Sequence, residues 1–168
     1  NTEPAFRIAY AGGKSFCQPY AANASSAFAS TTRYGQRFYP DRSLKLTNIS
    51  VVLRRDSTTV NAALAVREWS TKLLLSTSAI ASSAMSTTNR TLSFKLYPPV
   101  RLNPGTPYYF EVSRSSGTGN LYVNRQDTVG AGSYSWGGTN SCCIYSSNGG
   151  TTWVDQVHMD IGFTASGP

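Results

Sequence analysis

Apolar and polar residues alternate most clearly just after Asn103-Pro104-Gly105. This tripeptide predicts a turn, because proline presets φ and glycine accepts a positive φ at little cost. The segment that follows predicts a β-strand with one apolar and one polar face. The two faces are Tyr108, Phe110 and Val112, and Tyr109, Glu111 and Ser113.

The same alternation predicts further strands. They cover residues 6–11, 33–39, 44–53, 60–68, 92–96, 121–125, 144–145 and 157–163, with a short strand or loop edge at 134–136. Within 44–53 the apolar parity changes, which predicts a β-bulge or a break near Thr47-Asn48. Residues 146–150 (SSNGG) predict a tight hairpin turn. Residues 18–32 are interpreted as a loop or irregular arm, and residues 76–88 as a loop, with a helix as the alternative. Pro98-Pro99 is expected to end its strand.

Short strands that recur about every ten residues, without helical segments between them, are typical of sandwiches and jelly rolls. We therefore expect an all-β, antiparallel β-sandwich of the jelly-roll type. The expected organisation is an N-terminal strand and flexible arm over residues 1–32, followed by the β-sandwich domain over residues 33–168.

Positive charge is in excess, because 15 Lys and Arg against 8 Asp and Glu give a formal net charge of +7. This excess fits a diffusely basic surface without a dedicated site, and the alternative is an anionic partner such as an acidic polysaccharide, nucleic acid or lipid headgroup. Arg54-Arg55 is the densest basic cluster, so a nucleic-acid-binding arm is not expected. No segment approaches the roughly 20 apolar residues that a membrane-spanning helix needs.

Three cysteines stand at Cys17, Cys142 and Cys143. Neighbouring cysteines rarely bond to each other, because the geometry is strained. We expect Cys17 to form a disulfide with one member of the pair, which leaves the third thiol free or available to another chain. The alternative is three buried, reduced thiols.

Four motifs together resemble a known class of extracellular domain. They are Gln36-Arg37-Phe38, residues 49–54 (ISVVLR), Leu102-x-x-Gly105-Thr106-x-Tyr108-Tyr109, and Ser147-x-Gly149-Gly150-x-x-Trp153 ahead of the last strand. Over residues 33–164 the chain resembles jelly-roll domains of the choice-of-anchor or carbohydrate-binding-module-like type. The resemblance implies a secreted or cell-surface protein with a non-catalytic role.

The residues that could carry chemistry are few. His158 is the single histidine, no Gly-x-Ser-x-Gly motif is present, and the acidic residues are scattered, so an enzyme is not expected. Asp155 and Asp160 could contribute to a structural calcium ion of the kind that jelly-roll modules often hold. The alternative is that both are ordinary surface carboxylates.

Binding is the better-supported class of function. Sugars are held by aromatic faces together with planar polar groups, because C–H faces stack on rings and hydroxyls need hydrogen-bond partners. The candidate ligand-binding residues for a polysaccharide or glycan are Tyr122, Asn124, Arg125, Tyr134, Trp136 and Trp153. The alternative for the tryptophans is packing at the core or at the edge of the sandwich.

A second hypothesis is self-assembly into a homopolymer such as a filament or a surface layer. The predicted N-terminal strand, followed by a Gly-, Ala- and Ser-rich segment, could add to the open sheet edge of a neighbouring copy. In that case removal of residues 1–12 should abolish assembly.

Overall fold

A computed structural model describes residues 10–11, 13–17, 24–40, 42–127, 143–156, 159–161 and 163–167. Its strands are β1 (Tyr10–Ala11), β2 (Gly13–Cys17), β3 (Ala24–Phe28), β4 (Arg33–Phe38), β5 (Leu44–Arg55), β6 (Asn61–Glu68), β7 (Leu74–Ile80), β8 (Arg90–Leu102), β9 (Tyr108–Ser116), β10 (Leu121–Asp127), β11 (Cys143–Ser146), β12 (Val154–Gln156), β13 (Met159–Ile161) and β14 (Phe163–Gly167). A 3₁₀ helix, η1, covers Ser82–Ala84.

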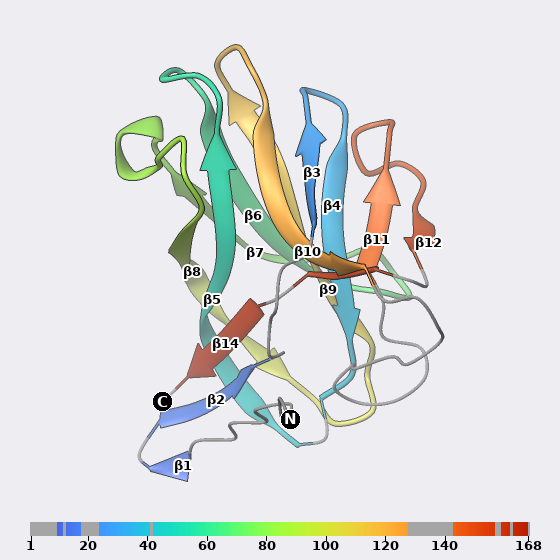
Figure 1. The fold of residues 1–168 in the computed structure, drawn as a ribbon. Helices are drawn as coiled ribbons and strands as arrows, with labels where there is room; N and C mark the ends of the chain where they lie inside the picture. The colour runs from blue at the N-terminus through green and yellow to red at the C-terminus, as the bar shows by residue number, and fades with distance from the viewer. Residues whose placement is uncertain are drawn as a thin grey trace, which may run out of the picture.

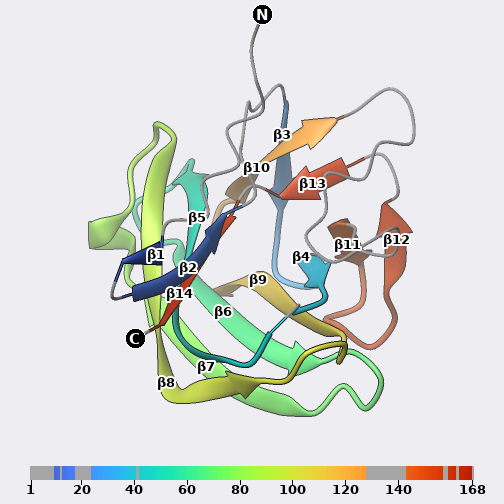
Figure 2. The same cartoon turned by 90° about the horizontal axis from the view of Figure 1, so that it is seen from below.

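The strands form an antiparallel sheet that curls into two layers, and this confirms the predicted all-β, jelly-roll-like class. One layer, here called the β9 sheet, has the strand order β12-β11-β4-β9-β6-β7. The other, here called the β5 sheet, has the order β1-β2-β14-β5-β8, and β10 with β3 and β13 lies alongside β5. Figure 1 shows the layers side on, and Figure 2 shows the curl from below, with β8 and β7 at the bend.

The core lies between the layers, where the predicted apolar faces meet. The alternating apolar residues of β6, Ala62, Leu64 and Val66, are fully buried. Phe110 and Val112 of β9 are fully buried as well. Phe163 of β14 packs edge-on against Phe110 with ring centroids 4.9 Å apart. Burial of each large apolar side chain contributes about 1.5–3 kcal/mol to folding. The sandwich is therefore held mainly by contacts between residues far apart in the sequence.

The predicted bulge is present, and it explains why two prolines lie inside a strand. The register between β5 and β8 shifts between Leu46 and Asn48, since Leu46 pairs with Val100 whereas Asn48 pairs with Lys95. Pro98-Pro99 falls in the interrupted part of this ladder, where β8 has no paired residue in β5. The prolines therefore remove no hydrogen bond between the two strands, although they lack an N–H group. The expectation that these prolines end the strand was wrong, and β8 continues to Leu102.

Two strands lie in segments that the sequence predicted to be loops. β3 pairs with β10, and its Phe28 lies opposite Leu121 with both side chains in the core. β7, made mainly of Ser, Thr, Ala and Leu, pairs along β6. Local propensity is weak in both segments, so the partner strand decides their conformation.

The ends of the chain meet in the β5 sheet. β2 pairs with β14 of the same chain, and β1 follows β2 at the end of the strand order. Residues 6–9 of the predicted first strand lie outside the described residues. The segment predicted as one strand at 157–163 contributes to two, because β13 pairs with β10 whereas β14 pairs with β2 and β5. The boundary predicted near residue 32 stays a prediction.

Gly35 provides a test of how tightly the β9 sheet is packed. A Cβ atom there would lie 2.3 Å from the carbonyl oxygen of Phe110 and 3.1 Å from the side chain of Ile144. We expect Gly35→Ala to lower the free energy of unfolding by about 3 kcal/mol, because the backbone must shift to relieve the contact. Chemical denaturation measures this loss.

Gly105→Ala is the matched control. Gly105 has φ +74° and no neighbour within 4 Å of the added Cβ, so only the backbone conformation is penalised, by about 1 kcal/mol. Equal losses in the two variants would contradict the close packing of Gly35.

Candidate functional site

The outer face of the β9 sheet carries polar and aromatic side chains from three neighbouring strands. On β4 and β9 these residues alternate with Phe38 and Phe110, which point into the core, so they point away from it. The register places Arg37 of β4 and Arg67 of β6 on either side of Tyr109 of β9. We call the whole surface the cationic aromatic face. It consists of Arg33, Arg37, Arg67, Trp69, Lys72, Tyr109, Glu111, Trp153 and Asp155.

A cluster of aromatic rings lies at its centre. Trp69 and Trp153 each contact Tyr109 edge-on, with ring centroids 5.5 Å and 5.4 Å apart. Ile144 lies beneath them and is fully buried. Tyr109 is therefore buried although it belongs to the outward parity of β9, while both tryptophans keep part of their surface exposed.

Two cations stack on Trp69. The guanidinium carbon of Arg37 lies 4.5 Å from the ring centroid, and the ammonium nitrogen of Lys72 lies 3.2 Å from it. Cation–π contacts at such distances are favourable because the ring face is electron-rich. Partial burial lowers the pKa of Lys72, and the positive charge of Arg37 is the second cause. The two cations therefore raise the local positive potential beside an aromatic surface.

Arg37 also binds a carboxylate through both of its terminal nitrogens. Nη1 and Nη2 donate to the two carboxylate oxygens of Asp155, at 3.2 Å and 3.0 Å. The side chain of Arg37 is 9% exposed, whereas that of Asp155 is 42% exposed. A buried guanidinium is thus paired with a carboxylate that reaches it from the solvent side.

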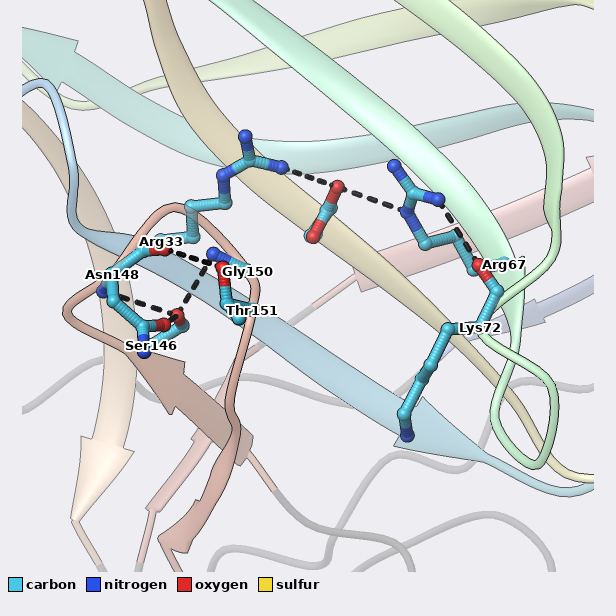
Figure 3. A network of polar contacts seen from close by, with 8 residues as sticks. Arg33, Arg67, Lys72, Ser146, Asn148, Gly150 and Thr151 are labelled. Carbon is cyan, nitrogen blue, oxygen red and sulfur yellow. Dashed lines mark hydrogen bonds and ion pairs between the residues drawn. The ribbon is translucent and has the colours of Figure 1, made fainter.

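Glu111 links the rest of the face. Its carboxylate is nearly buried, and Oε1 accepts from Arg33 at 2.7 Å and from Arg67 at 3.2 Å. Arg67 also donates to the backbone carbonyl of Lys72 at 3.1 Å, which ties the ion network to the turn after β6. Figure 3 shows Arg33 and Arg67 reaching one carboxylate from opposite sides, with Lys72 beside Arg67.

The turn that joins β11 to β12 covers this ion network. Ser146 accepts a hydrogen bond from the amide of Gly150 at 2.9 Å, and Thr151 donates to the carbonyl of Asn148 at 3.0 Å (Figure 3). Gly149 and Gly150 have φ of 72° and 87°, as the Asn-Gly-Gly sequence predicted. A Cβ atom on Gly150 would lie within 3.3 Å of the Glu111 carboxylate and within 3.2 Å of Arg33. Glycine therefore lets the turn close over the ion pair.

The face carries net positive charge. Four cationic residues, Arg33, Arg37, Arg67 and Lys72, stand against two carboxylates, which gives +4 − 2 = +2. Both carboxylates are already engaged by guanidinium groups. The surface is suited to binding a ligand that has aliphatic faces and anionic or hydrogen-bonding groups.

The structure separates the residues predicted to bind a ligand. Trp153 lies on the cationic aromatic face, whereas Tyr122 and Asn124 lie on β10 in the other layer. There Arg54 stacks over Tyr122 at 3.7 Å, and the hydroxyl of Tyr122 donates to Asp56 at 3.4 Å. Asn124 is buried. Tyr122 thus belongs to a second, smaller cation–aromatic pair.

Arg125 lies two residues after the buried Val123 on β10, so both lie on the inward face of that strand. Nη1 of Arg125 lies 2.6 Å from the sulfur of Met159. Tyr134 and Trp136 lie outside the described residues. Their part in a ligand site stays a prediction.

The predicted metal site and disulfide are only partly covered by the described residues. Asp155 is bound to Arg37, and the side chain of Asp160 lies outside the described part. Within the described ranges no group of three or more His, Cys, Asp and Glu could hold a metal ion. Cys143 is buried, with its sulfur 3.9 Å from the carbonyl oxygen of Ile144. Cys142 and the side chain of Cys17 fall outside, so the pairing stays a prediction.

The sequence analysis named two residues of the face as site candidates, Trp153 and Asp155. It missed the other seven, namely Arg33, Arg37, Arg67, Trp69, Lys72, Tyr109 and Glu111. The alternation along β4 contained a signal, because Arg33 and Arg37 lie on its polar face. In the structure this face of β4 lies beside the polar face of β9. The pairing itself could not be deduced from the alternation.

No protein-family model matches the sequence, and no curated protein matches it. Among the described residues, no helix combines the length and the apolar character that crossing a membrane would require.

Several solved structures are distantly similar. A carbohydrate-binding module, CBM36, solved in complex with calcium and xylotriose, has a TM-score of 0.34 and 11% identity, over 72% of this chain and 91% of the module. The VP2 subviral particle of infectious bursal disease virus has a TM-score of 0.38 and 12% identity, over 92% of this chain and 39% of the viral chain. The structure of the Gt strain of infectious bursal disease virus has a TM-score of 0.32 and 13% identity, over 96% of this chain and 38% of the viral chain. The chain thus spans less than half of these viral proteins, and similarity this low assigns no function.

The buried phenol of Tyr109 gives a prediction for alkaline pH. Burial, and next the negative charge of Glu111, raise the pKa of Tyr109 from 10.0 to about 12. The unfolded chain therefore loses this proton at a lower pH than the folded chain does. The stability from neutral Tyr109 is fully present below pH 10.0 and is lost as the pH rises toward about 12.

The measurement is the denaturant midpoint of the wild type and of Tyr109→Phe across this range. We expect the wild type to lose stability relative to Tyr109→Phe as the pH rises. Tyr97→Phe, at an exposed ring, is the matched control. If the denaturant midpoints of the wild type and of Tyr109→Phe differ by the same amount at every pH, the burial of this phenol is contradicted.

Proposed function

We propose that this chain is a non-catalytic carbohydrate-binding domain and that the cationic aromatic face is its binding surface. The observation that carries the proposal is the placement of Trp69 and Trp153 on either side of Tyr109, with Arg37 and Lys72 stacked on Trp69. This arrangement combines partly exposed rings with fixed hydrogen-bond donors, the two elements that sugar recognition requires.

The rings supply the apolar part of the recognition. Both tryptophans are partly exposed, but Arg37 and Lys72 already lie over the ring of Trp69. Trp153 is therefore the ring against which the C–H face of a pyranose can pack and displace water. Contacts with Tyr109 and Ile144 fix the ring positions before a ligand arrives. A preformed surface of this kind loses little conformational entropy on binding.

The guanidinium and ammonium groups supply the polar part. Arg33 and Arg67 retain 28% and 26% exposure at their side chains although both bind Glu111. Each guanidinium carries five N–H donors, more than one carboxylate oxygen can satisfy. The remaining donors at the exposed edges are suited to sugar hydroxyls.

The same proposal includes an extracellular or cell-surface location, because polysaccharides accessible to a binding domain lie mainly outside cells. The sequence resemblance to secreted jelly-roll domains supports that part of the proposal.

The test is binding of soluble polysaccharides by affinity electrophoresis and calorimetry, with Trp69→Ala and Trp153→Ala as the variants. Each variant should weaken binding by about tenfold or more, equivalent to about 1.4 kcal/mol. Trp153→Ala removes a stacking surface, and Trp69→Ala removes the ring that positions Arg37 and Lys72. The matched control is Tyr122→Ala, which removes the aromatic ring of the other cation–aromatic pair, on the β5 sheet. Loss of binding in Tyr122→Ala with retention in both tryptophan variants would move the site to β10.

Self-assembly through the N-terminal strand is the second candidate. The observation that favours it is the position of β1 at the end of the described strand order, since an edge strand leaves backbone groups open to another copy. Against it, β2 pairs with β14 of its own chain. Light scattering with and without residues 1–12 decides: large particles that dissociate on truncation support assembly, and a particle with the mass of one chain in both cases supports the binding domain.

A further inference from the structure

We propose that the cationic aromatic face selects glycans that carry carboxylate groups, as uronic acids do, and that Asp155 occupies the carboxylate subsite until such a ligand displaces it. This inference rests on the proposed function and specifies its ligand. The subsite is formed by Arg37 and Lys72, which flank Trp69.

The pairing of Arg37 with Asp155 shows what this subsite accepts. Two parallel hydrogen bonds at 3.2 Å and 3.0 Å join the guanidinium to both oxygens of one carboxylate. This bidentate geometry matches a planar carboxylate and adds specificity to the charge interaction. A ligand carboxylate can make the same pair of bonds.

Asp155 is located where a ligand carboxylate could displace it from Arg37. It is 42% exposed and lies in β12, a strand of three residues that ends the β9 sheet and pairs with β11. The pair is half-buried, so water screens it only from the carboxylate side, and a ligand carboxylate that takes the place of Asp155 keeps the covered guanidinium paired. Arg37, by contrast, has a side chain that is only 9% exposed, so Asp155 is the partner that solvent and a ligand can reach.

Lys72 supplies a second cation at the same place. Among the described residues its ammonium group has ring contacts with Trp69 and Tyr109, at 3.2 Å and 5.4 Å, and no hydrogen-bond acceptor. The proximity of Arg37 contributes to lowering the pKa of Lys72, so an anion between the two would relieve their repulsion.

The backbone of Lys72 indicates that the side chain is needed there. Its φ is 60°, in the left-handed region, where glycine fits without the penalty of about 1 kcal/mol or more that other residues bear. A residue other than glycine in this conformation at a surface turn is consistent with a role for its side chain. Here the side chain places an ammonium group over Trp69.

The experiment compares polygalacturonate with its fully methyl-esterified form, which keeps the sugar backbone and loses the charge. Dextran sulfate and single-stranded DNA serve as polyanions without carboxylates. Wild-type protein should bind polygalacturonate more tightly than each of the other three, by about tenfold for the ester, because one charge-assisted bidentate contact is lost.

Two variants test the subsite. Asp155→Asn removes the resident carboxylate and should tighten polygalacturonate binding by about threefold to tenfold, with the methyl ester unaffected. Lys72→Gly should weaken polygalacturonate binding by about the same factor while the protein remains folded, because glycine suits the backbone conformation at this position. Thermal unfolding checks that both variants are folded.

Asp56→Asn is the matched control for charge. It raises the net charge by the same unit as Asp155→Asn, but Asp56 lies beside Tyr122 at the β5 sheet and accepts a hydrogen bond from the amide of Asn120 at 2.6 Å. Equal tightening by Asp56→Asn and Asp155→Asn would mean a general charge effect and would overturn the subsite.

The outcomes separate this inference from the proposed function. Equal binding of the acid and its methyl ester, lost in Trp69→Ala, overturns the carboxylate subsite and leaves carbohydrate binding in place. Binding of DNA or dextran sulfate as tight as that of polygalacturonate also overturns it. Failure of both polygalacturonate and its ester to bind overturns the carboxylate subsite, and failure of every polysaccharide tested overturns the proposed function with it.

Discussion

The buried carboxylate of Glu111 constrains the arrangement of the β9 sheet more than any other polar group described in it. An isolated charge at such a position would cost several kcal/mol, so it has to be paired. Arg33 from β4 and Arg67 from β6 provide the pairing from the two strands that flank β9. The order of these three strands places a guanidinium group on either side of the carboxylate, and Gly150 of the turn between β11 and β12 lies close to both Arg33 and Glu111.

Because Glu111 and Tyr109 are covered from outside, β9 is buried on both faces. Its inner residues pack in the main core, and its outer residues form a second, small cluster with Ile144, Trp69 and Trp153. The turn after β6 is fixed to this cluster by a hydrogen bond from the amide of Trp69 to the carbonyl of Pro107, at 2.9 Å. The exposed surface of the cationic aromatic face is therefore carried by side chains whose positions are already set, so a ligand bound there would immobilise few of them.

The sequence predicted most of the β9 and β5 sheets, and it failed in identifiable places. The sequence placed Phe110 and Val112 in the core and indicated the bulge near Asn48. Both predictions follow from the alternation of apolar and polar residues within a single strand. It missed β3 and β7, where the residues have little intrinsic preference and the partner strand supplies the stabilisation. Of the candidate ligand residues it found Trp153 and grouped it with Tyr122, which lies in the other layer.

The sequence by itself determined which side chains share a face of each strand, because a period of two is a local property of the backbone. It also determined the turn at Asn103-Pro104-Gly105 and the glycine-rich turn ahead of Trp153, since φ preferences act within a few residues. Only the tertiary structure decided which faces lie side by side. Arg37 and Asp155 are 118 residues apart in the chain and meet because β4, β11 and β12 are neighbours in one sheet. That adjacency follows from the burial of apolar surface by the whole sandwich, which no local pattern encodes.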